Sequence, residues 1–475
     1  MKKKLLSLAL VLMLALTSVS GLALAEETVE EPFAEWNADA PALNALVDYV
    51  EAVTDESSPD YIPERDRIAV FDMDGTLMGE LYPTYLEYYM LAWRILKDPT
   101  IEPDAEMLAV GRTLRDCALD NSFPADMAMQ HAIQAARAYA GMTLGEFADF
   151  VTRILVREVD GFEGMTYATC FYLPMVEVVE YLQDNGFTCY VCSGSDRFIC
   201  RVFIEGMLEI PYNNIIGMDV ELEATNQGDT AGLDYVFTAQ DHVVRTDRLL
   251  IKNLKTNKVL QIAQEIGRQP VLSFGNSSGD VSMHNYTIYN NVYRSAAFML
   301  VADDEVRDYG NAEKGAGLKE KWEAAGFNVI SMANDWKTIY GEDVVKTGTF
   351  HWMEELAEER VPTDAEAEAA EEMQYVMYMG TNYKDTNKPV FTQDEAMEKA
   401  KEILIRHFGG YTIQEAHGGW IDGDTEYQEY TLVISLSDTT EDAVHAAADE
   451  LIEVFNQSSV LIQANPTKTE FYAAK

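Results

Sequence analysis

The clearest apolar run in the interior of the chain is Ile68–Phe71. A short run of β-branched and aromatic residues predicts a strand buried in a sheet. Asp72 and Asp74 follow directly, and Gly75 then allows the chain to turn. Because alternate side chains of an extended segment point the same way, both carboxylates can face one pocket beyond the strand end. The alternative is an ordinary strand that ends in an Asp-Gly turn.

Similar apolar runs recur along the chain and alternate with helical patterns. The predicted strands lie at 187–192, 215–222, 270–274, 296–301 and 328–332, with helices at 175–184 and 259–266. Such repeated alternation, with polar residues at the strand ends, predicts an α/β fold with a doubly wound parallel sheet. A turn at 226–232 is compatible with a hairpin beside the strand at 215–222.

Two of these later strands also end in polar residues. Ser193 and Gly194 follow the strand at 187–192, and a helix is predicted to begin shortly afterwards. A hydroxyl and a glycine at such a junction can offer O–H and N–H donors to a phosphate. Alternatively, Ser193 only caps the helix. The strand at 270–274 runs into the polar segment Gly275–Asp280.

A long segment with a helical pattern, rich in aromatic residues and methionine, covers 77–164. An insert directly after the first strand of an α/β domain is expected to lie over the strand ends as a cap. Tyr82, Tyr85, Tyr89 and Trp93 fall on one face of a predicted helix. This stripe is either a specificity pocket, such as a cation–π cage for a quaternary amine, or ordinary packing between helices, the commoner arrangement.

The last part of the chain carries a separate pattern. From residue 373 the predicted elements follow the order β-α-β-β-α-β, which is typical of a ferredoxin-like α+β sandwich. The helices lie at 393–406 and 441–456, and the strands at 375–379, 411–416, 430–436 and 460–464, with a turn at 418–420. No cluster of titratable residues indicates catalysis here. We expect this domain to bind a ligand or to mediate self-association or association with another protein.

The N-terminus has the pattern of a secretory signal peptide. Lys2–Lys4 precede an apolar run at 5–16, and small residues follow at Ala23–Ala25. We expect cleavage after Ala25. The predicted cleavage site has no cysteine, which argues against a lipoprotein anchor. No later apolar run is long enough to span a bilayer. An exported protein without stable membrane association is therefore predicted.

These patterns divide the chain into five expected segments. They are a signal peptide at 1–25, a leader at 26–66 with one helix at 41–53, an α/β domain at 67–350 whose helical insert covers about 77–168, an acidic linker at 351–372, and the small domain at 373–475.

The composition limits the possible partners. The formal charge is −45, and removal of the three signal-peptide lysines leaves 80 acidic against 32 basic residues, or −48. Such a surface repels nucleic acid and anionic lipid, so a small anion must be captured by a local site. Five cysteines do not make a disulfide scaffold. Cys189 and Cys192 have CxxC spacing, but on a strand they face opposite sides, which opposes redox and zinc functions.

The strand-end residues match four motifs in order. Asp72–Thr76 resembles the first motif of the haloacid dehalogenase superfamily in its phosphatase branch, Ser193 the second, Lys258 the third and Gly275–Asp280 the fourth. The neighbourhoods of the second and fourth motifs are similar to those of phosphoserine phosphatase and phosphorylcholine phosphatase. The resemblance covers about 67–341 and implies that superfamily's fold with a helical C1-type cap.

The resemblance implies phosphoryl transfer. Asp72 would attack phosphorus and form an aspartyl-phosphate, and Asp74 would act as general acid and base. Lys258 would neutralise charge, although Lys252 and Lys255 are rival candidates for this role.

The phosphate would be bound by Ser193, Gly194 and Thr76. An Asp at the position of Asp74 opposes a dehalogenase, which does not need that acid.

The resemblance also implies a Mg²⁺ site. Attack of a carboxylate on a phosphate dianion brings like charges together, and Mg²⁺ takes hard oxygen ligands. The expected ligands are Asp72, the backbone carbonyl of Asp74, and Asn276, with Asp280 acting through a water or by fixing Lys258. The family more often has Asp where this chain has Asn276, so the site loses one negative charge.

Two functions follow from these patterns. The first is an exported Mg²⁺-dependent phosphomonoesterase that acts on a small phosphorylated metabolite, with a phosphoserine-like or a phosphocholine-like substrate. The second is a non-catalytic extracytoplasmic binding protein with a retired phosphatase site, in which residues 373–475 are the working part.

Overall fold

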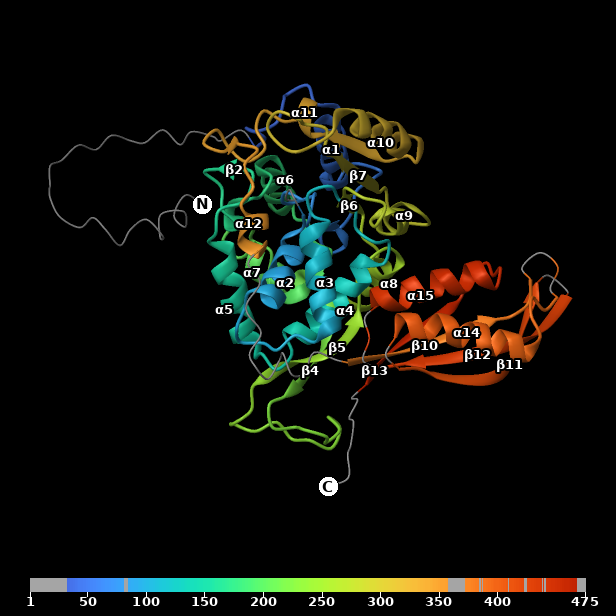
Figure 1. Cartoon of the computed structure of the whole chain (residues 1–475). Helices are drawn as coiled ribbons and strands as arrows, with labels where there is room; N and C mark the ends of the chain where they lie inside the picture. The colour runs from blue at the N-terminus through green and yellow to red at the C-terminus, as the bar shows by residue number, and fades with distance from the viewer. Residues whose placement is uncertain are drawn as a thin grey trace. The chain divides into compact units, whose positions relative to one another are not determined.

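The computed structural model describes residues 32–80, 84–357 and 372–467, except 384, 385, 387, 409, 423, 424, 438 and 440. The predicted signal peptide, Tyr82 and most of the acidic linker lie outside the described residues. The described chain divides into two compact units, and Figure 1 labels their helices and strands. One reaches to Leu86 and resumes at Tyr139–Phe350, and the other comprises Glu87–Ala138 and the residues from His351 onward.

The first unit contains a seven-stranded sheet. Its strands, in spatial order, are β5 (Val243–Ile251), β4 (Ile215–Ala224), β3 (Thr188–Asp196), β1 (Ile68–Phe71), β6 (Leu272–Gly275), β7 (Ala296–Val301) and β8 (Asn328–Ser331). All neighbours are parallel except β5, which pairs antiparallel with β4 as the predicted hairpin. The parallel sheet predicted from the helix–strand alternation is confirmed.

Helices lie before, between and after these strands, and three of them correspond to the helices predicted at 41–53, 175–184 and 259–266. The helices are α1 (Pro41–Thr54), α5 (Leu144–Leu155), α6 (Leu173–Asp184), α7 (Arg197–Ile204), α8 (Thr256–Glu265), α9 (Val281–Ile288), α10 (Ala312–Ala324) and α11 (Met332–Asp335). Helix α6 begins with Pro174 in its first turn, where a missing N–H costs nothing. It is followed by Gly186 at φ +77°, so the chain turns sharply into β3.

Three short 3₁₀ segments and one small sheet complete this unit. The 3₁₀ segments are Glu64–Asp66, Tyr167–Thr169 and Tyr212–Asn214. The small sheet joins β2 (Phe162–Glu163) to β9 (Val345–Lys346). The helical pattern over 77–164 did not indicate β2, whose two residues pair with a segment far away in the sequence.

Strand β1 lies in the middle of the sheet and is buried along its whole length. Its apolar run does not alternate because helices cover both faces of a parallel sheet. The Phe71 ring stacks on Phe274 of β6 at 4.5 Å, and Phe274 stacks on Phe298 of β7 at 5.0 Å. These aromatic contacts join three neighbouring strands at the carboxyl end of β1, next to Asp72.

The second unit includes helices α2 (Leu86–Leu96), α3 (Ala105–Asp116), α4 (Met127–Ala138) and α12 (Trp352–Ala357). Tyr89 and Trp93 lie on α2, and both donate hydrogen bonds to the carboxylate of Glu355 on α12, at 2.9 and 3.1 Å. Tyr85 precedes the helix, so the predicted four-residue stripe is shorter on α2. These contacts favour the packing interpretation of the stripe. That the insert covers the strand ends stays a prediction.

The C-terminal part of this unit is an antiparallel sheet with two helices. Its elements are β10 (Glu372–Gly380), α14 (Gln393–His407), β11 (Thr412–Asp422), β12 (Thr425–Leu436), α15 (Glu441–Val454) and β13 (Leu461–Thr467). The strand order β11-β12-β10-β13 with antiparallel neighbours confirms the ferredoxin-like prediction.

The turn predicted at 418–420 is wrong, because these residues lie inside β11 and pair with β12. A Cβ on Gly418 would lie 2.5 Å from the Thr431 hydroxyl, so this glycine serves close approach between strands.

Among the described residues, no helix is both long enough and apolar enough to cross a bilayer.

Candidate active site

The site forms where three neighbouring parallel strands end. Asp72 follows β1 and donates its backbone N–H to the Phe274 carbonyl of β6 at 2.9 Å. Ser193 lies within β3, which continues to Asp196 instead of ending at residue 192 as predicted. The N-cap of α7 is Asp196, whose carboxylate accepts the Phe198 N–H at 2.9 Å. The alternative that Ser193 caps this helix is therefore wrong.

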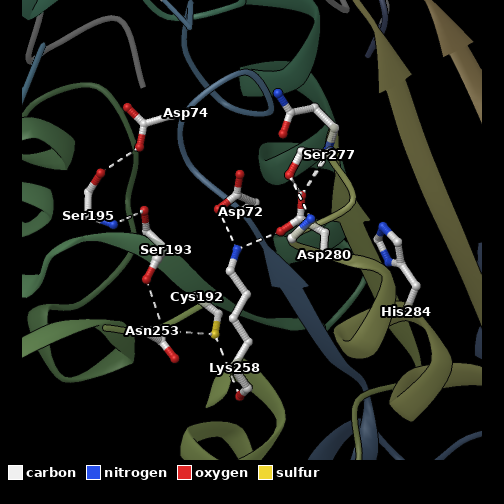
Figure 2. Close-up of polar contacts among 12 residues, drawn as sticks. Asp72, Asp74, Cys192, Ser193, Ser195, Asn253, Lys258, Ser277, Asp280 and His284 are labelled. Atoms are coloured by element: carbon white, nitrogen blue, oxygen red, sulfur yellow. Dashed lines mark hydrogen bonds and ion pairs between the residues drawn. The ribbon is translucent and has the colours of Figure 1, made fainter. Parts of the chain in front are cut away.

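A buried lysine joins two carboxylates. Lys258 Nζ lies 2.5 Å from Asp72 Oδ1 and 2.6 Å from Asp280 Oδ1, and the side chains of Lys258 and Asp280 are only 1% exposed. Figure 2 shows the Lys258 side chain reaching from α8 to a point between the two carboxylates. Of the three candidate lysines, Lys258 is the one that contacts Asp72.

Asp280 uses both of its carboxylate oxygens within the protein. Oδ1 accepts from Lys258, while Oδ2 accepts the N–H of Asn276 at 3.2 Å, the N–H of Ser277 at 3.0 Å and the Ser277 hydroxyl at 3.1 Å. These contacts hold the loop after β6 and fix Lys258, which is one of the two roles expected for Asp280. A role in metal binding through a water stays a prediction.

The charges of this cluster do not balance within the protein. Burial and the negative charge of Asp280 raise the pKa of Asp72, and Lys258 lowers it by less. Burial alone would lower the pKa of Lys258, but the two carboxylates raise it by more, so the pKa lies above its usual value. One ammonium group therefore serves two buried carboxylates, and an additional cation at Asp72 would stabilise its ionised form.

The second aspartate is held by a residue that the sequence analysis did not single out. Ser195 Oγ donates to Asp74 Oδ2 at 2.7 Å, and the Ser195 N–H donates to Ser193 Oγ at 3.0 Å (Figure 2). Burial raises the pKa of Asp74, and the hydrogen bond from Ser195 lowers it by less. Ser195 lies two positions after Ser193, so strand periodicity could have placed it on the same face.

Asn253 is a second contributor without any signal in the sequence. Its Nδ2 donates to the Ser193 carbonyl at 2.9 Å, which fixes the backbone at the expected phosphate-binding position. Gly194 lies beside it, and a Cβ there would lie 2.6 Å from Leu254 Cδ2, so a larger residue would have to displace the Leu254 side chain.

The first turn after β1 is tightly packed. Gly75 has φ +73° and donates its N–H to the Met78 carbonyl at 2.7 Å. Thr76 is fully buried, and its hydroxyl has no hydrogen-bond partner among the described residues. The structure thus places Thr76 away from solvent, and its predicted contact with substrate stays a prediction.

The residues at this turn fit a Mg²⁺ ion. A Cβ on Gly75 would lie 1.9 Å from Asn276 Nδ2, so the amide packs against the Asp74–Gly75 backbone. Asp72 Oδ2 accepts no hydrogen bond from the described residues. A carboxylate, a backbone carbonyl and an amide oxygen are the hard donors that Mg²⁺ prefers. No three His, Cys, Asp or Glu side chains gather as a metal site in the described part of the chain, and this donor set does not require three.

Comparison with known protein families finds a match that includes these residues. Residues 69–284 match the model of the haloacid dehalogenase-like hydrolase family, and this segment contains Asp72, Asp74, Ser193, Lys258 and Asp280. The matched segment is therefore similar to that family, and the match covers less than half of the chain. No curated protein matches the chain.

Several solved structures are similar to the chain at low identity. A functionally unknown protein from Anaerococcus prevotii DSM 20548 has 13% identity and a TM-score of 0.38, covering 64% of this chain and 96% of its own. Cytosolic 5'-nucleotidase IIIB bound to cytidine has 10% identity and a TM-score of 0.38, covering 66% of this chain and 90% of its own. A phosphoserine phosphohydrolase-like protein from Francisella tularensis subsp. tularensis SCHU S4 has 14% identity and a TM-score of 0.29, covering 56% of this chain and 94% of its own.

Proposed function

We propose that the protein is an exported, Mg²⁺-dependent phosphomonoesterase that acts on a small phosphorylated metabolite through an aspartyl-phosphate on Asp72. The observation that carries the proposal is the position of Lys258, whose Nζ lies 2.5 Å from Asp72 Oδ1. A buried carboxylate with its own ammonium partner, and a second carboxylate two residues further on, are the groups that covalent phosphoryl transfer requires.

The first step transfers the phosphoryl group to the protein. Asp72 Oδ2, which accepts no hydrogen bond from the described residues, attacks phosphorus while the bond to the leaving oxygen breaks. Asp74 donates its proton to that oxygen, and its raised pKa favours the protonated form that this step needs. The Ser193 hydroxyl and the Gly194 N–H hold a phosphoryl oxygen.

The second step returns the phosphoryl group to water. Asp74, now ionised, removes a proton from a water molecule, which attacks phosphorus as the bond to Asp72 breaks. Lys258 stays paired with Asp280 through both steps and keeps its charge beside the nucleophile. When bound by Asp72, the Asp74 carbonyl and Asn276, Mg²⁺ would supply further positive charge to the phosphoryl oxygens.

Phosphate release from an aryl phosphate tests this proposal. The purified protein is expected to release phosphate with Mg²⁺, and Asp72→Asn should lower the rate at least about 10³-fold. Asp229→Asn, which changes an exposed aspartate in the β4–β5 connection, is the matched control and should retain full activity. Equal turnover by Asp72→Asn would overturn the assignment of the nucleophile.

Beryllium fluoride separates this function from a binding protein with a retired site. Together with Mg²⁺ it mimics an aspartyl-phosphate, so a catalytic site should show a large rise in Tm that Asp72→Asn abolishes. No rise in the wild-type protein would favour the non-catalytic alternative.

The proposed substrate and location rest on sequence patterns and need their own tests. A panel of phosphorylated metabolites, with phosphoserine and phosphocholine included, would identify the substrate class. N-terminal sequencing of the protein recovered outside the cell should begin at Glu26 if cleavage occurs after Ala25. Association through the C-terminal domain can be measured by light scattering with and without residues 373–475.

A further inference from the structure

The amide of Asn276 has a carboxylate partner. Asn276 Nδ2 donates to Glu80 Oε1 at 3.3 Å, and the Tyr85 hydroxyl donates to the same oxygen at 2.9 Å. Glu80 itself is exposed and follows the turn that Asp72 and Asp74 begin. Asn276 Oδ1 accepts no hydrogen bond from the described residues. The donor edge of the amide is therefore engaged, and its acceptor edge is not.

This contact decides which way the amide faces. An asparagine side chain can present either its oxygen or its NH₂ group to a neighbour, but only NH₂ can donate to a carboxylate. Glu80 thus holds Nδ2 on the side of its own carboxylate, so that Oδ1 faces the opposite side. The close packing of Nδ2 on Gly75, where a Cβ would lie at 1.9 Å, keeps the amide beside the Asp74–Gly75 backbone.

The same contact brings a negative charge close to the position of Asn276. Where the family more often has Asp, Asn276 is neutral, and the carboxylate of Glu80 lies one hydrogen bond away. An Asp at position 276 would instead place two like charges at hydrogen-bond distance, which is unfavourable. Glu80 and Asn276 are therefore suited to each other in a way that Glu80 and an aspartate are not.

We propose that Glu80 is a positioning residue for the divalent cation: it orients the Asn276 amide so that Oδ1 faces the metal, and it supplies from outside the ligand set the negative charge that asparagine lacks. This inference rests on the proposed function, because it takes Mg²⁺ as the ion of this site. Partners of metal ligands at this distance change metal affinity by about 10- to 100-fold when removed.

Direct Mg²⁺ binding in four proteins tests the proposal. Calorimetry with Mg²⁺ alone would compare the wild type, Glu80→Gln, Asn276→Asp and the double variant. Glu80→Gln is expected to weaken binding about tenfold in the wild-type background. In the Asn276→Asp background there is no amide to orient, so the same change should weaken binding clearly less than in the wild-type background. Glu320→Gln, an exposed glutamate on α10, controls for the loss of one charge and should have no effect.

The outcomes separate this inference from the function on which it rests. The inference is overturned if Glu80→Gln leaves Mg²⁺ binding unchanged, or weakens it equally in both backgrounds, since equal weakening indicates a general charge effect. A change only in KM for a cationic substrate would assign Glu80 to the substrate and would also overturn it. If the wild-type protein binds no Mg²⁺, the proposed function fails together with the inference. Asn276 is half-buried, so circular dichroism is used to check that all four proteins fold.

Discussion

Ser195 Oγ donates a hydrogen bond to Asp74 Oδ2 at 2.7 Å. This bond stabilises the ionised carboxylate, so its loss in Ser195→Ala should raise the pKa of Asp74 further. The limb of the kcat/KM pH profile that reports Asp74 is expected to move to higher pH, and kcat should fall about tenfold.

Ser195→Thr, which keeps the hydroxyl, should restore the wild-type limb. Ser57→Ala, at an exposed serine, is the control and should leave the profile unchanged. An unshifted limb in Ser195→Ala would show that this contact does not influence the acid/base group.

Gly75→Ala tests the tight contact at the turn after β1. The new Cβ would meet Asn276 Nδ2, and φ +73° is already unfavourable for alanine. Gly267 provides a matched control, because it has φ +70° and no atom within 4 Å of the added Cβ. Gly267→Ala should cost only the backbone strain of about 1 kcal/mol. Gly75→Ala should lower the free energy of unfolding by more than this, as measured by urea denaturation, and should also weaken Mg²⁺ binding. Equal costs would contradict the close packing of Asn276 on this turn.

Lys258→Met removes the cation between two buried carboxylates. Breaking a buried ion pair by removing one partner costs about 3–5 kcal/mol, so Tm should fall clearly and phosphatase activity should be lost. Adding Asp280→Asn removes one of the uncompensated charges and should recover part of the stability without recovering activity. A single variant with wild-type Tm would be incompatible with the observed burial of this lysine.

Arg245 and Asp196 form a buried ion pair at the far end of the Ser193–Asp196 segment. Arg245 Nη2 lies 2.7 Å from Asp196 Oδ2, and the guanidinium lies 4.0 Å from the centre of the Phe147 ring. Arg245→Met should destabilise the protein by about 3–5 kcal/mol in urea denaturation, and adding Asp196→Asn should reduce that loss.

Arg248→Met on the same strand is the matched control. The Arg248 side chain is 60% exposed and pairs with Glu221, so its loss should lower the free energy of unfolding much less than the loss of Arg245. Similar losses for both arginines would contradict a specific role for the buried pair.

Asp308 should make stability depend on pH. Burial raises its pKa from 3.8 to about 6, although its carboxylate accepts the Tyr340 hydroxyl at 2.9 Å. The folded state therefore binds more protons than the unfolded state between these values, so this group's contribution to stability falls as pH rises from about 4 to 6. Asp308→Asn removes that dependence. Its Tm should exceed that of the wild type at pH 7.5, and the difference should shrink towards pH 4. A variant that is less stable at every pH would contradict this account.

Much of the fold followed from local patterns. The strand at Ile68–Phe71 was predicted because four apolar residues end abruptly at carboxylates, and the C-terminal βαββαβ order was readable from periodicity alone. The predictions failed where distant segments override local signals. Glycines at 418–419 indicated a turn but lie inside β11, because their small size allows close pairing with β12. The two residues of β2 form a strand only because β9 pairs with them.

For the candidate site, the sequence indicated the candidate residues, and the tertiary structure decided their partners. Asp72, Asp74, Ser193 and Lys258 could be identified because each follows or precedes a recognisable element. The choice of Lys258 over Lys252 and Lys255 needed the 2.5 Å contact with Asp72. The contributions of Ser195, Asn253 and Glu80 are contacts between segments, and one-dimensional periodicity does not record which segments meet. Side-chain hydrogen bonds depend on distances of a few tenths of an ångström, which only the packed sheet and its loops define.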